Sequence, residues 1–192
     1  MASDHFAVLG QPRRPWLDPE QLKQDYQRLT FALHPDRQSE PPADGSDFGA
    51  VTDAYRVLSN PKLRLQHLLA LENEASDSQS GRVSTELAET FMQTAALIAS
   101  VDDVLKRKQQ AITTLASSLL MPEISKVKER VDSQVEALQH ARANCMDELK
   151  RLDQRWENDS DKRAEARKLA DRFGFLDRWI AQLREKQFAL SN

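Results

Sequence analysis

The sequence is poor in the residues that build several kinds of site. Cysteine occurs once in 192 residues, at position 145. A single thiol excludes an internal disulfide, a cysteine-based zinc site and an iron–sulfur cluster held by this chain alone, and it is typical of a reducing compartment. No run approaches the roughly 20 apolar residues that span a bilayer, and the N-terminus lacks the features of a signal peptide. We therefore expect a cytoplasmic protein.

Glycine and net charge are also scarce. The five glycines are few against an average usage of about 7%, so we expect few tight turns and long helices. The 27 basic and 30 acidic residues give a net charge of −3. This near balance predicts that neither nucleic acid nor a membrane surface is the main partner.

Motifs for catalysis are missing as well. The sequence has no glycine-rich phosphate loop and no GxSxG elbow. Its histidines are too scattered for their spacing to define a ligand set. We therefore expect no enzyme activity, no metal site and no cofactor. Cys145 falls on the apolar stripe of a helix, where a buried core position is the favoured interpretation.

The prolines divide the chain into two parts. Seven of the eight precede residue 72, and only Pro122 lies beyond it, which predicts short helices followed by long ones. The polar stretch at 73–83 predicts a linker. The expected domains are therefore 1–72 and 84–192.

Helix signals in the first part are strong. Asp18 can cap a helix, Pro19 suits its first position, and Gln21 can complete a capping box. Apolar residues then recur at helical spacing until Pro35, which ends the helix. Two shorter helices are expected from Phe48 and after residue 60.

The second part carries three apolar stripes with helical spacing, and no strand pattern competes with them. We expect an all-α fold in which these stripes form the seams of an antiparallel three-helix bundle. Met121-Pro122 is predicted to separate the first helix from the second, and Asn158-Asp159-Ser160 the second from the third. The first stripe is Leu87, Phe91, Ile98, Val101, Leu105, Ile112, Leu115 and Leu119.

The sharpest motif is His34-Pro35-Asp36. It lies between two predicted antiparallel helices, where Pro35 stiffens the loop and Arg37 adds a positive charge. Together with its flanks, the motif resembles the J domain of DnaJ-type co-chaperones. The run at 60–71 and the following bundle are more similar to the HscB type. Besides the motif, the resemblance is carried by Asp4-His5-Phe6, Val8-Leu9-Gly10, Tyr26-Gln27-Arg28-Leu29, Phe48, Val51, Ala54-Tyr55, Val57-Leu58-Ser59 and Arg64, and in the bundle by the run at 172–178.

This resemblance implies a partner and a binding loop. J domains bind a DnaK/HscA-type chaperone and stimulate its ATPase through the His-Pro-Asp loop, which is an allosteric effect rather than a catalytic one. Lys23 and Arg28 match the family's basic positions on the helix before the loop. Gln27 and Ala32 stand where positive charge is common, so we expect a weaker electrostatic encounter.

The resemblance also implies a client. HscB-type bundles bind the iron–sulfur scaffold protein IscU through an apolar patch, which matches Phe91, Met92 and Phe175 here. Phe91 also falls on the predicted core stripe, so burial is an alternative interpretation. Where the family has acidic residues after the first patch positions, this chain has an uncharged run at 94–99.

Two functions are compatible with these patterns. The first is a co-chaperone that delivers a client, an IscU-like scaffold. The second is a J-domain protein whose long helices self-associate into a homo-oligomer and recruit the chaperone to a different client.

Overall fold

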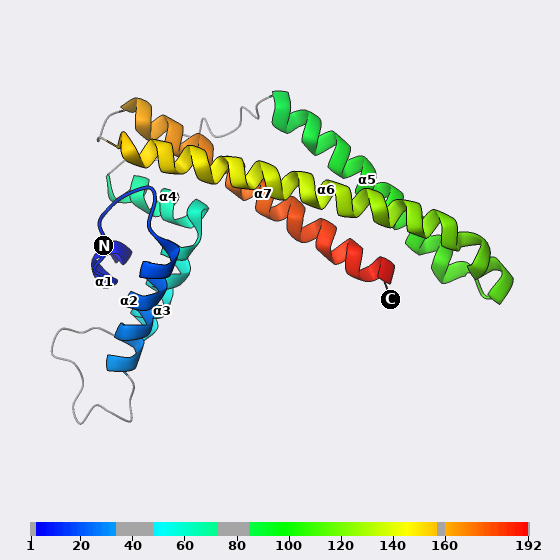
Figure 1. Ribbon diagram of the computed structural model, residues 1–192, viewed down its shortest axis with the longest axis horizontal. Helices are drawn as coiled ribbons and strands as arrows, with labels where there is room; N and C mark the ends of the chain where they lie inside the picture. The colour runs from blue at the N-terminus through cyan, green and yellow to red at the C-terminus, as the bar shows by residue number, and fades with distance from the viewer. Residues whose placement is uncertain (1–2, 34–47, 73–84, 157–159, 192) are drawn as a thin grey trace. The chain divides into compact units, whose positions relative to one another are not determined.

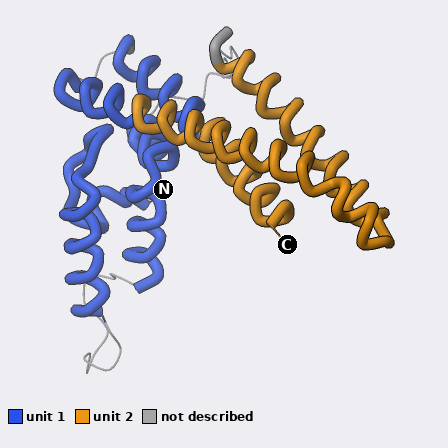
Figure 2. Tube along the Cα trace, turned by 45° about the vertical axis from the view of Figure 1, so that its right-hand side comes forward, with its two compact units in different colours: residues 1–80, 146–173 blue, residues 81–145, 174–192 orange. Residues whose placement is uncertain are grey.

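The computed structural model describes residues 3–33, 48–72, 85–156 and 160–191 of the chain (Figure 1). Seven helices and no strand occur in these ranges, which confirms the predicted all-α fold. The residues form two compact units (Figure 2). Unit 1 comprises Met1–Ser80 and Met146–Phe173, and unit 2 comprises Gly81–Cys145 and Gly174–Asn192. These units do not coincide with the expected domains at 1–72 and 84–192, so that division, whose linker at 73–83 lies outside the described residues, stays a prediction.

Unit 1 contains four shorter helices and parts of two longer ones. The four are α1 (His5–Val8), α2 (Pro19–Ala32), α3 (Phe48–Ser59) and α4 (Pro61–Leu71). Helix α3 packs against α1, α2 and α4. The longer ones are the end of α6 (Thr114–Gln154) and the beginning of α7 (Ser160–Ser191). The core of this unit is built from Phe6, Leu9, Leu17, Leu22, Val51, Ala54, Leu58 and Leu68.

Helix α2 begins as the sequence predicts. The Asp18 carboxylate accepts hydrogen bonds from the amides of Glu20 and Gln21 at 3.0 and 2.9 Å, with Pro19 in the first helical position. Gln21 does not complete the predicted capping box. Its side-chain amide instead donates to Asp25 at 3.0 Å. Because Asp18 already serves two of the free amides, the helix start does not need a second cap.

The segment between α1 and α2 is fastened by buried polar groups. Gly10 has a φ of 62°, in the left-handed region that glycine enters without strain, and it turns the chain out of α1. Arg64 is buried and donates to the carbonyl of Pro15 at 2.7 Å and to that of Leu58 at 2.6 Å. Burial lowers the pKa of Arg64 to about 10, partly offset by Asp153. The guanidinium thus joins α3 and α4 to the segment that precedes α2.

Two histidines meet where α1 contacts α4. The backbone amide of His5 donates to the Nε2 atom of His67 at 3.0 Å. The two imidazole rings lie with centroids 4.4 Å apart, and Phe6 stacks on His67 at 5.6 Å. An Nε2 atom that accepts a hydrogen bond carries no proton, so this contact requires a neutral His67.

Unit 2 is built from α5 (Thr85–Gln110), α6 up to Cys145 and α7 from Gly174. These are the three predicted bundle helices, and their seams are filled by buried aliphatic side chains. Cys145 is fully buried among them, which confirms its predicted core position. The other buried seam residues are Leu97, Val101, Val104, Ile124, Val127, Val131, Val135, Leu138, Leu176, Ile180, Leu183 and Leu190.

The predicted break at Met121-Pro122 is wrong. Helix α5 ends earlier, at Gln110, and α6 begins at Thr114 and runs through Pro122. As a result Ile112, which was expected on the first seam, lies in the turn and is 95% exposed. The predicted seam residues Leu115 and Leu119 are also exposed. Apolar spacing identified a helix here but assigned its residues to the wrong side of the turn.

Candidate functional site

The exposed side of α2 carries the two basic residues singled out in the sequence. Lys23 and Arg28 are both exposed. Arg28 forms an ion pair with Asp25 at 2.7 Å, which neutralises part of its charge. Lys23 makes no ion pair with a described residue. This face therefore presents little net positive charge, as expected from the residues at 27 and 32.

The buried carboxylate of Asp25 holds Arg28 in place on this face of α2. This carboxylate accepts hydrogen bonds from the side chains of Gln21 at 3.0 Å and Gln11 at 2.9 Å, and it pairs with Arg28. The hydrogen bond from Gln21 is the largest cause that lowers the pKa of Asp25, and burial opposes it. The hydrogen bond from Gln11 and the positive charge of Arg28 lower this pKa further. The carboxylate thereby fixes the exposed guanidinium on α2.

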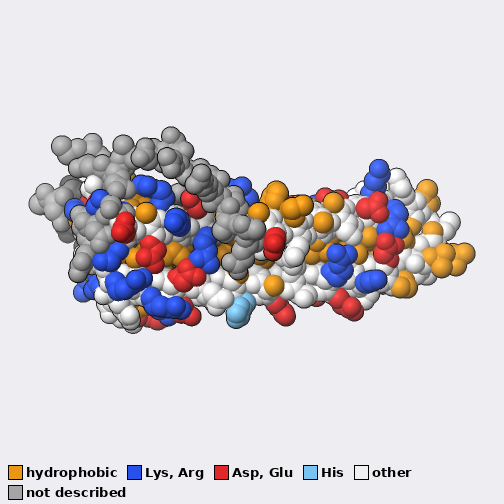
Figure 3. Space-filling model, turned by 90° about the horizontal axis from the view of Figure 1, so that it is seen from above, with side chains coloured by type: hydrophobic (Ala, Val, Ile, Leu, Met, Phe, Trp, Pro, Cys, Tyr) orange, Lys and Arg blue, Asp and Glu red, His pale blue; other side chains and the backbone are white. Residues whose placement is uncertain are grey.

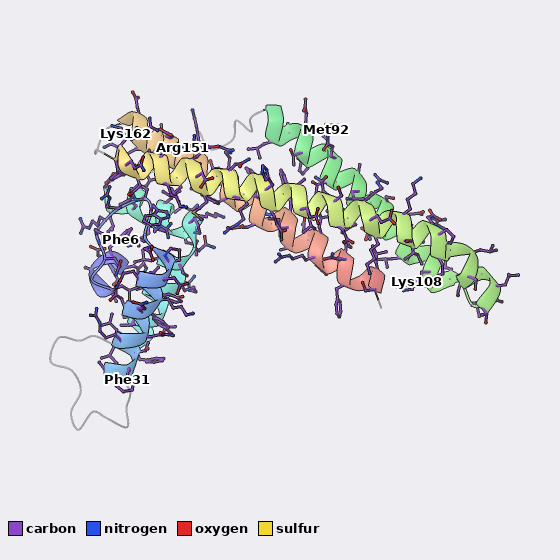
Figure 4. The ribbon with its side chains drawn as sticks, in the orientation of Figure 1. Phe6, Phe31, Met92, Lys108, Arg151 and Lys162 are labelled. Atoms are coloured by element: carbon purple, nitrogen blue, oxygen red, sulfur yellow. The ribbon has the colours of Figure 1, made fainter. Side chains whose placement is uncertain are left out.

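The predicted binding loop, with His34, Pro35, Asp36 and Arg37, lies outside the described residues. The described end of α2 adds Phe31, whose side chain is 61% exposed three residues before the loop (Figure 4). The sequence analysis missed Phe31 because it falls off the apolar stripe of its helix. An aromatic residue off the stripe is itself a signal of exposure.

A second candidate surface lies on unit 2, where α5 and α7 meet. Phe91 is 53% exposed and Met92 is 71% exposed, and Met92 extends away from α5 in Figure 4. The exposure of Phe91 decides against the alternative that it is a core residue. The half-buried ring of Phe175 and the ring of Phe91 each lie 6.0 Å from the buried indole of Trp179. These four residues form what we call the aromatic patch.

Trp179 is the member of the patch that the sequence analysis did not find. It follows Phe175 by four residues on α7, so the two side chains share a helix face. That spacing was available in the sequence. The indole lies beneath both phenyl rings and supports them from the bundle core.

The uncharged run at 94–99 does not extend the patch. Thr94 is fully buried, and its hydroxyl accepts a hydrogen bond from the side chain of Gln134 at 3.2 Å. Thr94, the first residue of this run, therefore serves the contact between α5 and α6.

Two kinds of site are absent from the described part of the chain. No group of three or more His, Cys, Asp or Glu side chains is arranged to hold a metal ion. No described helix combines the length and the apolar character that crossing a membrane requires.

Comparison with known families identifies the N-terminal helices. The DnaJ domain model matches residues 4–67. Over 64 residues, or 33% of this chain, the sequence is 39% identical to chaperone protein DnaJ of Methanosarcina thermophila, and it is 41% identical over 64 residues to that of Acaryochloris marina. In each case the match spans only 16% of the relative's length. Residues 4–67 of this chain thus match a DnaJ domain.

Solved structures specify which J-domain architecture this is. The chaperone HscB from Vibrio cholerae superimposes with a TM-score of 0.56 at 14% identity, covering 98% of this chain and 99% of that one. The human co-chaperone HscB gives a TM-score of 0.50 at 18% identity, covering 97% and 83%. The fold of this chain is therefore similar to that of these two HscB structures.

Proposed function

We propose that this protein is a co-chaperone that binds a DnaK/HscA-type ATPase chaperone and stimulates its ATP hydrolysis. The observation that carries the proposal is the DnaJ domain match over 4–67, with the described hairpin helices α2 and α3 on either side of the His34-Pro35-Asp36 segment. The loop, with Lys23 and Arg28, binds the hydrolysis-competent state of the chaperone more tightly and shifts its equilibrium. The chain supplies no catalytic group.

A single-turnover ATPase assay with a purified DnaK/HscA-type chaperone tests this activity. We expect the native chain to accelerate hydrolysis and Asp36→Asn to abolish the acceleration. Asp53→Asn is the matched control, because Asp53 is an exposed carboxylate on α3 that pairs with Arg56, a neighbour on its own helix. Stimulation that survives Asp36→Asn unchanged would overturn the mechanism.

The aromatic patch is proposed as the client site. Monomeric proteins seldom leave several large apolar side chains exposed together without a partner. Aromatic rings and methionine are also the side chains that dominate binding energy at interfaces. The HscB-type fold supports an IscU-like iron–sulfur scaffold as the client, with Phe91, Met92 and Phe175 as the contacts.

Titration calorimetry with an IscU-like scaffold tests the client. Phe91→Ala combined with Phe175→Ala is expected to weaken binding by at least about tenfold, as removal of two interface rings does. Phe188→Ala provides the control, since Phe188 is a 71% exposed phenylalanine of unit 2 outside the patch. Native protein that binds no scaffold would point to another client, while equal losses in both variants would remove the patch from the interface.

A further inference from the structure

The turn between α5 and α6 combines exposed apolar side chains with a complete lack of charge. No charged residue occurs between Lys108 and Glu123; we call residues 109–122 the hairpin tip. Ile112 is 95% exposed, and Leu115, Leu119 and Met121 are 72%, 73% and 60% exposed. Figure 3 shows hydrophobic side chains gathered at the right-hand end of the view, where Figure 1 draws the turn between α5 and α6.

The exposed apolar side chains surround the tip. Leu115 and Leu119 are four residues apart and share one face of α6. Met121 follows Leu119 by two residues, which places it on the opposite side of the helix. A protein groove covers one face of a helix, whereas the boundary region of a bilayer surrounds an inserted turn. The distribution therefore favours a lipid environment over a one-sided protein partner.

Side-chain hydroxyls of the tip pair with part of its own backbone. The hydroxyl of Thr113 accepts from the amide of Ala116 at 3.2 Å, and the hydroxyl of Ser117 donates to the carbonyl of Ala111 at 3.3 Å. The hydroxyl of Ser118 donates to a carbonyl one turn earlier at 2.9 Å. The first two bonds serve backbone groups that a helix end would otherwise leave to water, and the third satisfies the serine hydroxyl. Internal pairing of this kind lowers the free-energy cost of moving the turn into an apolar medium.

A basic collar lies directly behind the tip on both helices. Residues 105–128 contain five basic side chains and one acidic side chain, Glu123. Arg107 pairs with Glu123 and also with Asp103, one turn earlier on α5. The lysines on α5 and α6, of which Figure 4 labels Lys108, are therefore the basic side chains that the collar offers to a partner. Lysines at this position attract anionic headgroups while their alkyl stems lie along apolar surface. The lysines are Lys106, Lys108, Lys126 and Lys128.

We propose that the hairpin tip docks into the surface of an anionic lipid bilayer, with its apolar side chains in the headgroup boundary and the lysine collar on the lipid phosphates. Apolar insertion and a polybasic collar are the two signals that together give stable, reversible membrane attachment. The net charge of the whole chain is −3 and does not reveal that basic side chains are concentrated next to the hairpin tip. The inference does not depend on the co-chaperone function, because it uses neither the J domain nor the aromatic patch.

Vesicle flotation with the full-length protein tests the proposal. We expect binding to phosphatidylcholine vesicles containing about one third phosphatidylglycerol, little binding to pure phosphatidylcholine, and loss of binding in about 0.5 M salt. Leu115→Gln with Leu119→Gln should reduce the partition coefficient by at least about tenfold. Lys106→Gln with Lys126→Gln should reduce it by about tenfold or more. All five positions tested, control included, are exposed, and circular dichroism verifies that each variant is folded.

The matched control is Phe188→Gln, which removes a comparably exposed apolar side chain elsewhere on unit 2 and should leave vesicle binding unchanged. Four outcomes would overturn the proposal: no binding of the native chain to anionic vesicles, undiminished binding of the leucine variant, an equal loss in the Phe188 control, or binding that is insensitive to lipid charge. A fifth outcome that would overturn the proposal comes from sedimentation of the protein in the absence of lipid. A dimer that Leu115→Gln with Leu119→Gln converts to a monomer would identify the tip as a contact between two copies of this chain.

Discussion

At the residue scale, His67 makes the packing of α1 on α4 sensitive to pH. Burial, followed by the neighbouring His5, lowers the pKa of His67 against the opposing charge of Asp4. The unfolded chain therefore binds the proton more readily than the folded one, and stability is lost as pH falls below about 6.5. We expect the melting temperature to be lower at pH 5.5 than at pH 7.5.

The variant His67→Gln separates this effect from general acid sensitivity. Glutamine keeps a hydrogen-bond acceptor for the amide of His5 but has no proton to gain, so the drop between pH 7.5 and pH 5.5 should shrink. His140→Gln, an exposed histidine of α6, serves as the control. A full drop in His67→Gln would assign the pH effect to other groups.

Arg64 is expected to be the most sensitive single charge in unit 1. Arg64→Met keeps much of the side-chain volume but leaves the carbonyls of Pro15 and Leu58 without their donor. We expect a loss of about 3 kcal/mol in the free energy of unfolding, measured by urea denaturation. Arg56→Met on α3 provides the comparison, because Arg56 is exposed and pairs with an exposed Asp53; it should change stability very little.

At the element scale, Pro122 lies inside α6 at a cost that packing tolerates. A proline there removes a backbone donor and crowds the preceding turn. Because Pro122 is exposed and has no packing role to lose, Pro122→Ala should stabilise the protein by about 1–3 kcal/mol. Thermal denaturation measures the change, and a lower melting temperature would contradict the prediction.

Pro19→Ala is the matched substitution for this experiment. Pro19 is also exposed, but it occupies the first position of α2, where the missing amide costs nothing and the ring fixes a helical φ. The same change should therefore leave stability unchanged or reduce it slightly. Equal gains at both positions would show that the helix interior is not the cause.

The two prolines also show which helix boundaries the sequence could predict. Asp18 with Pro19 marks a start through two local interactions, and the structure confirms both. Pro122 was interpreted as a break because its local penalty is large, yet packing along α6 outweighs it. The real turn, at Ala111–Thr113, carries no glycine or proline, and its exposed apolar residues continue the helical spacing, so no local signal marks it.

The residues of the candidate surfaces also differ in whether the sequence could predict them. Spacing and resemblance singled out Phe91 and Phe175, but periodicity alone placed Phe91 in the core. Whether a stripe is buried depends on how far the neighbouring helix extends, which no local pattern encodes. Trp179 could have been predicted from its spacing of four residues from Phe175. The hydrogen bond from Gln11 to Asp25 spans a loop, so it could not be predicted without the folded structure.

At the scale of the whole molecule, the N-terminal helices α1–α4 are stabilised by residues at and just after the end of α6, more than 80 residues later in the sequence. Within unit 1, the Asp153 carboxylate accepts from the amide of Trp16 at 3.1 Å and pairs with Arg14 at 3.2 Å. Trp156 packs against the core that holds Phe6. A fragment of residues 1–72 lacks these partners, and we expect its helices to exchange amide hydrogens faster than the same helices in the full chain.

Asp153→Ala in the full chain isolates the polar part of this effect. It leaves the amide of Trp16 without its acceptor and should destabilise unit 1 by about 1–3 kcal/mol. Asp147→Ala, two turns earlier on α6 and 60% exposed in a pair with Lys150, is the control and should have little effect. Protection in the 1–72 fragment equal to that in the full chain would show that α1–α4 are self-sufficient.

The burial of Cys145 has a practical consequence for measuring how the bundle opens. A thiol enclosed in the core reacts with an alkylating reagent only during moments when the helices around it separate. Since it is the chain's only cysteine, its alkylation in native buffer is a single-site clock. The rate of that reaction reports the opening equilibrium of unit 2 in the unmodified protein, with or without a bound client or vesicle.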